Sequence, residues 1–212
     1  MYSRTDRADD QPQPNPRSRK IYVLWGIAIS TLVALGLVCW LVVVPVLEVR
    51  SFVQDPGSSE KPMDELLGGE KRAAERLAAY ARMPSWIVPQ QDRWSSVLLL
   101  SNCGESGLRE CGRLLSDEDP EMRKQGMAVI LAMAPDHDLG VVKLDLLHAL
   151  EHDPSSKIKR WASEVLGRWM EVDSQLLSEL KRMTRQDDED TKGYATVALN
   201  GAKKRLAEEQ ED

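Results

Sequence analysis

The sequence is poor in the residues that build β-sheets and cofactor sites. It has one Phe, three Cys and three His among 212 residues. Outside an apolar stretch near the N-terminus, no segment alternates β-branched and polar residues as half-buried strands do. Gly-rich phosphate loops, the G-x-S-x-G elbow of hydrolases and the Cys/His spacing of zinc fingers are also absent. These absences predict an all-α protein without a cofactor.

Charged residues are absent from Ile21 to Leu47. As a helix these residues would extend roughly 40 Å, more than the ~30 Å hydrocarbon core of a bilayer requires. The run is longer than the ~7–15 residue core of a cleaved signal peptide, and no small-x-small cleavage site follows it. Residues 21–47 are therefore predicted to cross the lipid bilayer once, as a transmembrane helix.

Small residues recur every four positions within this run, at Gly26, Ser30 and Ala34. Such a stripe lets two membrane helices approach closely, so a homodimer formed through the span is one interpretation. The alternative is that small residues are simply common in membrane helices.

Basic residues flank the predicted span unequally. Five precede it, whereas only Arg50 and Lys61 follow it closely. By the positive-inside rule, residues 1–20 are a disordered cytoplasmic tail and the C-terminal domain lies outside the cytoplasm, in the periplasm if the membrane is an inner membrane.

The rest of the chain has a net negative charge. The whole chain has 28 Lys and Arg against 34 Asp and Glu, and residues 1–20 carry a net +2, so the remainder carries −8. Binding to phosphates requires a positive surface, so this balance argues against a nucleic-acid partner.

Helical periodicity begins after a polar stretch rich in Pro, Gly and Ser, so residues 48–63 are predicted to be a linker. Residues 64–208 are predicted to form one helical domain, and residues 209–212 an acidic tail. The expected helices are 64–83, 91–102, 106–115, 119–134, 137–152, 155–170, 173–185 and 189–208.

Several of these helices repeat one pattern. Asp119-Pro120 and Asp153-Pro154 stand 34 residues apart, and each precedes a helix. Asp is a good N-cap, and Pro at the next position forfeits only an N–H that would be unpaired. Small residues then fall at equivalent mid-helix places, followed three positions later by apolar ones; the small residues are Ala74, Gly126, Ala162 and Ala195. A single hairpin of this kind cannot bury its apolar face, whereas a stack of hairpins can.

On these residues the chain resembles the HEAT-repeat family of α-solenoids. Met122-Arg123 and Ile158-Lys159 match the pair that follows Asp-Pro in that family, and Ala162 and Leu166 match the positions after it. The match is best over residues 106–206. The resemblance implies a right-handed solenoid of about three to four hairpins that binds other proteins.

One segment has the spacing of a zinc enzyme. Residues 148–152 read H-x-x-E-H, the signature of inverted-motif metallopeptidases. If the motif had that role here, His148 and His152 would bind zinc and Glu151 would activate a water molecule. The apolar stripe of the same helix places both His residues toward solvent, and those enzymes are larger. The preferred interpretation is therefore two exposed His residues near the end of a helix and not a zinc site. No catalytic residue is assigned.

Two cysteines, Cys103 and Cys111, lie on either side of a glycine-containing break. An exported domain permits a disulfide between them, and two buried thiols are the alternative.

The sequence therefore predicts a single-pass, membrane-anchored scaffold that binds protein partners. The alternatives are an enzyme, either a zinc hydrolase or a lyase like those found in a branch of the HEAT-repeat family, and a structural subunit of a membrane complex.

Overall fold

The protein was analysed as a computed structural model, which describes residues 30–34, 44–54, 65 and 67–210. All regular structure in these ranges is helical, so the all-α prediction is confirmed for the described part. The chain divides into two compact units, Met1–Pro45 and Val46–Asp212, and the second contains the helical domain.

The helical domain consists of short helices joined by tight turns. After residues 30–34, which are helical, the elements are α2 (Val44–Gln54), α4 (Glu70–Ala81), α5 (Gln90–Leu99), the 3₁₀ helix η2 (Leu100–Cys103), α6 (Gly104–Leu114), α7 (Pro120–Met133), η3 (Gly140–Val142), α8 (Lys143–His152), α9 (Ser156–Arg168), α10 (Ser174–Met183) and α11 (Glu189–Glu208).

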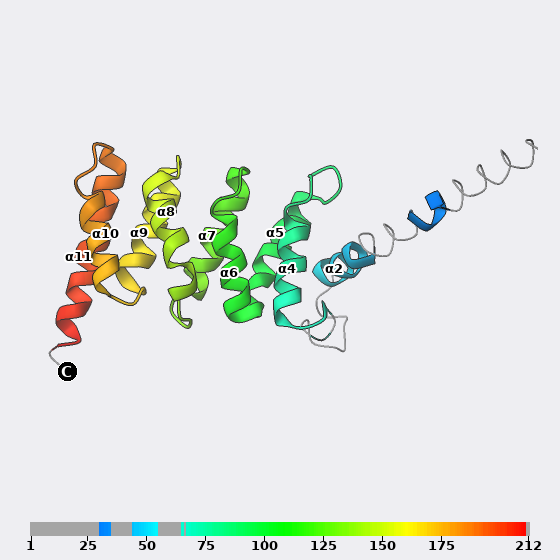
Figure 1. Ribbon diagram of the computed structural model, residues 1–212, viewed down its shortest axis with the longest axis horizontal. Helices are drawn as coiled ribbons and strands as arrows, with labels where there is room; N and C mark the ends of the chain where they lie inside the picture. The colour runs from blue at the N-terminus through cyan, green and yellow to red at the C-terminus, as the bar shows by residue number, and fades with distance from the viewer. Residues whose placement is uncertain (1–29, 35–43, 55–64, 66, 211–212) are drawn as a thin grey trace, which may run out of the picture. The chain divides into compact units, whose positions relative to one another are not determined.

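Within Val46–Asp212 the helices pack as four consecutive hairpins (Figure 1). The pairs are α4 with α5, α6 with α7, α8 with α9, and α10 with α11. The second helices also contact one another in order, α5 against α7, α7 against α9, and α9 against α11. Contacts between hairpins therefore run mainly from each one to its neighbour, as in a stacked array.

Small residues in mid-helix make this stacking close. Ala74, Ala162 and Ala195 are buried, and a Cβ on Gly126 would lie 2.8 Å from the Cβ of Leu114. The four apolar residues that follow three positions later are buried as well; they are Leu77, Val129, Val165 and Ala198. The positions that the sequence pattern aligns in these four helices are thus similarly buried.

Charged side chains join successive hairpins in the same way three times. Each cation comes from the second helix of one hairpin, and each carboxylate lies at or shortly before the start of the second helix of the next. The three pairs are Arg93–Asp119 at 2.9 Å, Arg123–Asp153 at 2.8 Å and Lys159–Asp188 at 2.7 Å. We call these three pairs the charge ladder.

Two rungs of the charge ladder also cap helices. The carboxylate of Asp119 accepts a hydrogen bond from the backbone N–H of Glu121, and that of Asp188 accepts one from Thr191. Pro120 follows Asp119 at the first helical position, as the sequence predicts. Asp153 differs, because α9 begins only at Ser156 and Asp153 accepts from the backbone N–H of Ser155 instead.

The first part of the predicted linker is helical, which corrects its boundary. α2 continues to Gln54, and Val49, Phe52 and Val53 are buried. Glu48 pairs with Arg76 of α4 at 3.1 Å, so α2 is attached to the first hairpin. The physical reason is an apolar triplet at i, i+3 and i+4, which gives this polar segment one buried face.

The first helix of the stack begins six residues later than predicted. Gly68 and Gly69 have φ values of 88° and 99°, and α4 starts directly after them at Glu70. Positive φ is available to Gly at little cost but interrupts a right-handed helix.

No helix in the described ranges is long and apolar enough to cross a membrane. Most of the predicted span, residues 21–29 and 35–43, lies outside these ranges, as does Gly26. Ser30 and Ala34 are described; both are helical and exposed. The tail 1–20 also lies outside the described residues.

Candidate functional site

The H-x-x-E-H segment forms the end of α8. His148 and His152 are exposed, and their ring centroids lie 4.8 Å apart, as expected for residues on one helix face. Among the described residues, no group of three or more His, Cys, Asp or Glu side chains is arranged to hold a metal ion. The His pair alone supplies two of the three or four protein ligands that zinc sites use.

Glu151 of the same segment is bonded to the next hairpin. Arg182 of α10 donates to both carboxylate oxygens, at 2.7 Å and 2.6 Å, and the side-chain amide of Gln186 donates to one of them. These bonds, with that of Arg182 the largest cause, lower the pKa of Glu151 to about 2. A general base is most effective when its pKa lies near the operating pH, so this carboxylate is poorly suited to activating water.

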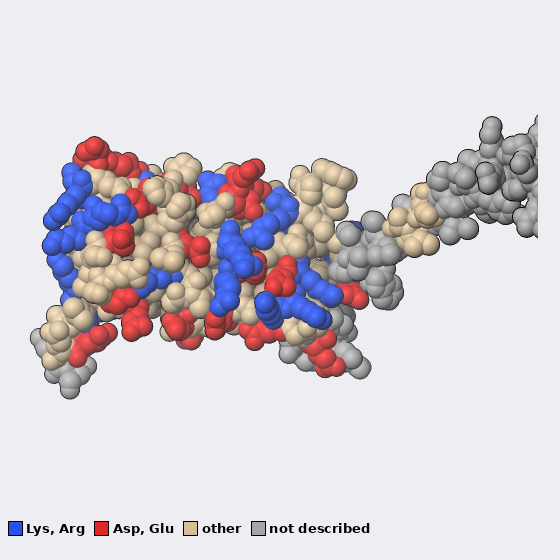
Figure 2. All heavy atoms as spheres, in the orientation of Figure 1, with Lys and Arg blue, Asp and Glu red and all other residues tan. Residues whose placement is uncertain are grey.

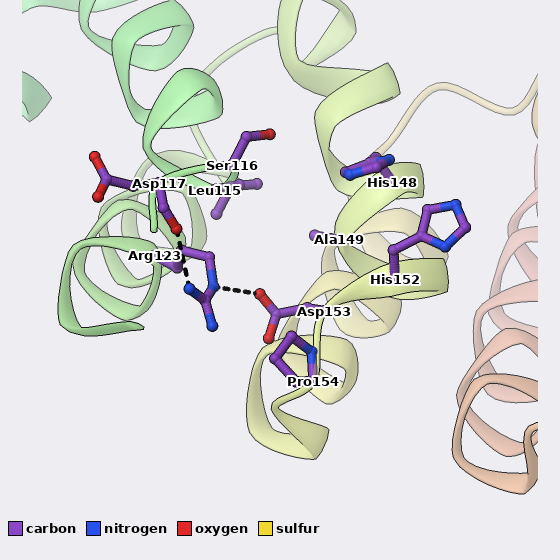
Figure 3. Close-up of a pocket in the computed structure, with 9 residues that line it drawn as sticks. All are labelled: Leu115, Ser116, Asp117, Arg123, His148, Ala149, His152, Asp153 and Pro154. Carbon is purple, nitrogen blue, oxygen red and sulfur yellow. Dashed lines mark hydrogen bonds and ion pairs between the residues drawn. The ribbon is translucent and has the colours of Figure 1, made fainter. Parts of the chain in front are cut away.

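A small pocket of about 220 Å³ lies beside the His pair (Figure 3). Its walls come from the turn before α7 and from the end of α8. Arg123 occupies one side, and the two His side chains project from α8 on the other.

The polar groups of this pocket are already paired with one another. Arg123 donates from Nε to Asp153 and from Nη1 to the backbone carbonyls of Asp117 and Glu118, at 3.0 Å and 3.2 Å. The carboxylate of Asp117 pairs in turn with Arg82 at 3.3 Å. These groups therefore hold the first three hairpins together, and none of the bonds points to a ligand.

Cys103 and Cys111 are buried thiols in the structure and are not joined by a disulfide. A Cβ on Gly107 would lie 3.1 Å from the Cβ of Cys103, and Cys111 follows Gly107 by one helical turn. Burial raises the pKa of Cys111, and the neighbouring Cys103 adds to the effect.

The larger concavity, of about 780 Å³, lies between the second helices of the last two hairpins. We call it the α9–α11 groove. Arg160, Glu164 and Arg168 form its α9 wall at intervals of four residues. The α11 wall consists of Tyr194, Val197, Gly201, Lys204, Arg205 and Glu208, and Ser163 and Gly167 line the space between the walls.

Two glycines set the spacing of the groove walls. A Cβ on Gly201 would lie 2.8 Å from the carbonyl oxygen of Gly167, so α9 and α11 approach to backbone contact there. Arg205 fixes the same junction by donating to the carbonyls of Gly167 at 3.1 Å and Met170 at 2.5 Å. The two helices are thus closely packed beneath the groove, and a larger side chain at either glycine would separate them.

The groove is more basic than the domain around it. Its lining has four basic and two acidic side chains. Lys and Arg also gather at the α10–α11 end of the stack and over α4 to α6 on the face shown in Figure 2. Glu164 and Glu208 lie near Arg168 and Lys204, at 4.0 Å and 3.6 Å, in solvent-exposed pairs.

The sequence did not point to this groove. Its residues come from two helices about 30 positions apart in the chain, and each looks like an ordinary exposed position on its own helix. The one available signal was the spacing of Arg160, Glu164 and Arg168 on a single face. Comparison of the chain with known protein families, curated proteins and solved structures gives no match.

Proposed function

We propose that the protein is a membrane-anchored scaffold, whose HEAT-like repeat domain binds a partner protein outside the cytoplasm. In this proposal residues 21–47 cross the membrane once, residues 1–20 stay in the cytoplasm, and the helical stack is carried on the other side. The span is also a candidate for self-association through Gly26, Ser30 and Ala34.

The α9–α11 groove is the observation that supports the proposal most. Stacked helical hairpins bury their apolar stripes between neighbours and leave the outer faces of the second helices as an extended surface. Here that surface includes a groove with a closely packed floor, charged walls and an exposed apolar side chain, Val197, of which 61% is accessible. Such a surface suits a protein segment better than a reaction, because it lacks an activated nucleophile or base.

The zinc-hydrolase alternative is weakened by the environment of Glu151, whose carboxylate is held by Arg182 and Gln186. The third alternative, a structural subunit of a membrane complex, differs from the scaffold in using the span itself as the interface. It predicts that partners contact residues 21–47 and not the helical domain.

Site-specific photocrosslinking tests the proposal. A photoreactive phenylalanine analogue in place of Val197, in the full chain in its native membranes, is expected to give a discrete adduct. The matched control is Thr196, which is exposed on α11 but does not line the groove. Adducts formed only from the span, or from neither helix of the groove, would contradict the scaffold and favour the structural subunit.

Reporter fusions test the orientation. An enzyme active only outside the cytoplasm, fused after Asp212, is expected to be active. Activity of a cytoplasmic reporter alone at that position would reverse the assignment.

A further inference from the structure

We propose that the α9–α11 groove binds an acidic protein segment that carries an apolar side chain on the face it presents. This inference rests on the scaffold function and specifies the chemistry of its partner.

The charges of the groove favour carboxylates. Arg160 has no ion-pair partner among the described residues, and Arg205 donates to backbone carbonyls and not to a carboxylate. Glu164 and Glu208 pair only with exposed cations, and such exposed pairs are weak, so an incoming carboxylate can replace them. A groove with this excess of positive charge, on a domain of net negative charge, discriminates in favour of acidic segments.

The apolar part of the groove requires a second feature of the partner. Val197 lies on the α11 wall beside the half-buried Tyr194. Covering the side chain of Val197 removes apolar surface from water, which stabilises a complex. The occupant therefore needs an apolar side chain near the end of its acidic face that lies over Tyr194 and Val197.

The length of the groove sets the size of the segment. Its α11 wall runs from Tyr194 to Glu208, a rise of roughly 21 Å along the helix. A helical segment of about 14 residues has the same length, and a single small anion would fill only part of such a groove. The proposed occupant is therefore an acidic amphipathic helix of this size.

Fluorescence polarisation with a model peptide tests the inference. The protein is the full chain in nanodiscs of zwitterionic lipid, and the probe is a labelled peptide of about 14 residues with Glu and Leu at helical spacing. We expect saturable binding that weakens as salt is added, because exposed charge pairs are screened. A peptide of the same length with Lys in place of Glu is expected to bind at least tenfold more weakly.

Two matched pairs of variants locate the binding site. Lys204→Glu is expected to weaken binding about fivefold to tenfold, whereas Lys203→Glu, on the neighbouring exposed residue outside the groove, leaves it unchanged. Val197→Asp weakens binding similarly, and Thr196→Asp does not. Circular dichroism confirms that all four variants stay folded.

Three results would overturn the inference: equal affinity for the acidic and basic peptides, equal losses within each variant pair, or no saturable binding. Binding of the groove to anionic nanodiscs in place of the peptide would assign it to lipid headgroups and overturn it as well. A crosslink from Val197 together with any of these results would retain the scaffold and reject only the acidic partner.

Discussion

Arg123 reaches from α7 to the carboxylate of Asp153, with Nε 2.8 Å from Oδ2, and the two side chains are 13% and 2% exposed. This pair is the least exposed rung of the charge ladder. Because Asp153 is withdrawn from water, its charge depends on this guanidinium and on the backbone N–H of Ser155.

Removing the cation from this rung is expected to be costly. Arg123→Ala leaves Asp153 buried without its partner, a change that costs about 3–5 kcal/mol in comparable buried pairs. The control is Arg109→Ala, since Arg109 and Glu105 form an exposed pair on one helix, worth about 0.5 kcal/mol or less. Chemical unfolding followed by circular dichroism measures both. Equal effects would mean that the rung is no stronger than a surface pair.

The small residues of the stack give a second prediction. Ala162 is fully buried in the middle of α9. Ala162→Leu overpacks the contact between helices, at a cost of about 1–3 kcal/mol, and so lowers the melting temperature. The control, Ala207→Leu, changes an exposed residue near the end of α11 and is expected to leave the melting temperature unchanged. A neutral Ala162→Leu would show that the repeat alignment is wrong.

The thiols are expected to be unreactive in the folded protein. The thiolate is the nucleophile, and burial raises the pKa of Cys111, so a maleimide reagent should label neither Cys111 nor the equally buried Cys103 at neutral pH. Both should react in denaturant without a reducing agent, which peptide mass spectrometry detects. If they react only after reduction, the two cysteines form a disulfide after all.

Acid is expected to destabilise the domain. The folded pKa of Glu151 is about 2, against an ordinary value of 4.5, and those of Asp119 and Asp173 are also below 3.8. A carboxylate whose pKa is lower in the folded state stabilises the folded state when the pH is above its ordinary pKa. For Glu151 this contribution is lost as the pH falls from about 4.5 toward 2. Asp145 opposes the trend, because burial raises its pKa.

Unfolding midpoints measured from about pH 7 to pH 3 should therefore decline mainly in the lower part of that range. Glu151→Gln removes one of the titrating groups and should reduce the decline. An unchanged pH profile in this variant would argue against its bond to Arg182.

The His pair is expected to be dispensable. His148→Ala with His152→Ala removes two exposed side chains that take no part in the stack, so folding and the crosslink from Val197 should be unchanged. Metal analysis of the purified full chain should find no stoichiometric zinc. Stoichiometric zinc that disappears in the double variant, with loss of activity and an intact fold, would restore the hydrolase interpretation.

The all-helical fold and the starts of several helices were readable from the sequence because each helix contains its own local signals. Asp119-Pro120 marks a helix start, and the small residue Gly126 marks a helix contact, without reference to distant parts of the chain. Helix capping and the apolar stripe depend only on residues within one helix and its ends, so they can be recognised even where the helices share little sequence.

Features that depend on two distant segments were missed. The charge ladder joins residues about 26 to 30 positions apart, and nothing in the sequence assigns Arg93 to Asp119 rather than to a nearer carboxylate. α2 was missed because it is held by residues distant in the chain, such as Arg76, which pairs with Glu48. The α9–α11 groove arises from the approach of two helices, which composition does not reveal.

The attachment of α2 to the first hairpin sets how far the α9–α11 groove lies from α2. The Glu48–Arg76 pair joins α2 to the first hairpin, whereas the α9–α11 groove belongs to the last two hairpins. Neighbouring second helices lie about 8–10 Å apart, and the groove lies between α9 and α11, so it is roughly 20–25 Å farther along the stack than α5. With α2 packed against that hairpin, the stack would act as a spacer, and a partner bound in the proposed groove would be held at a set distance from α2.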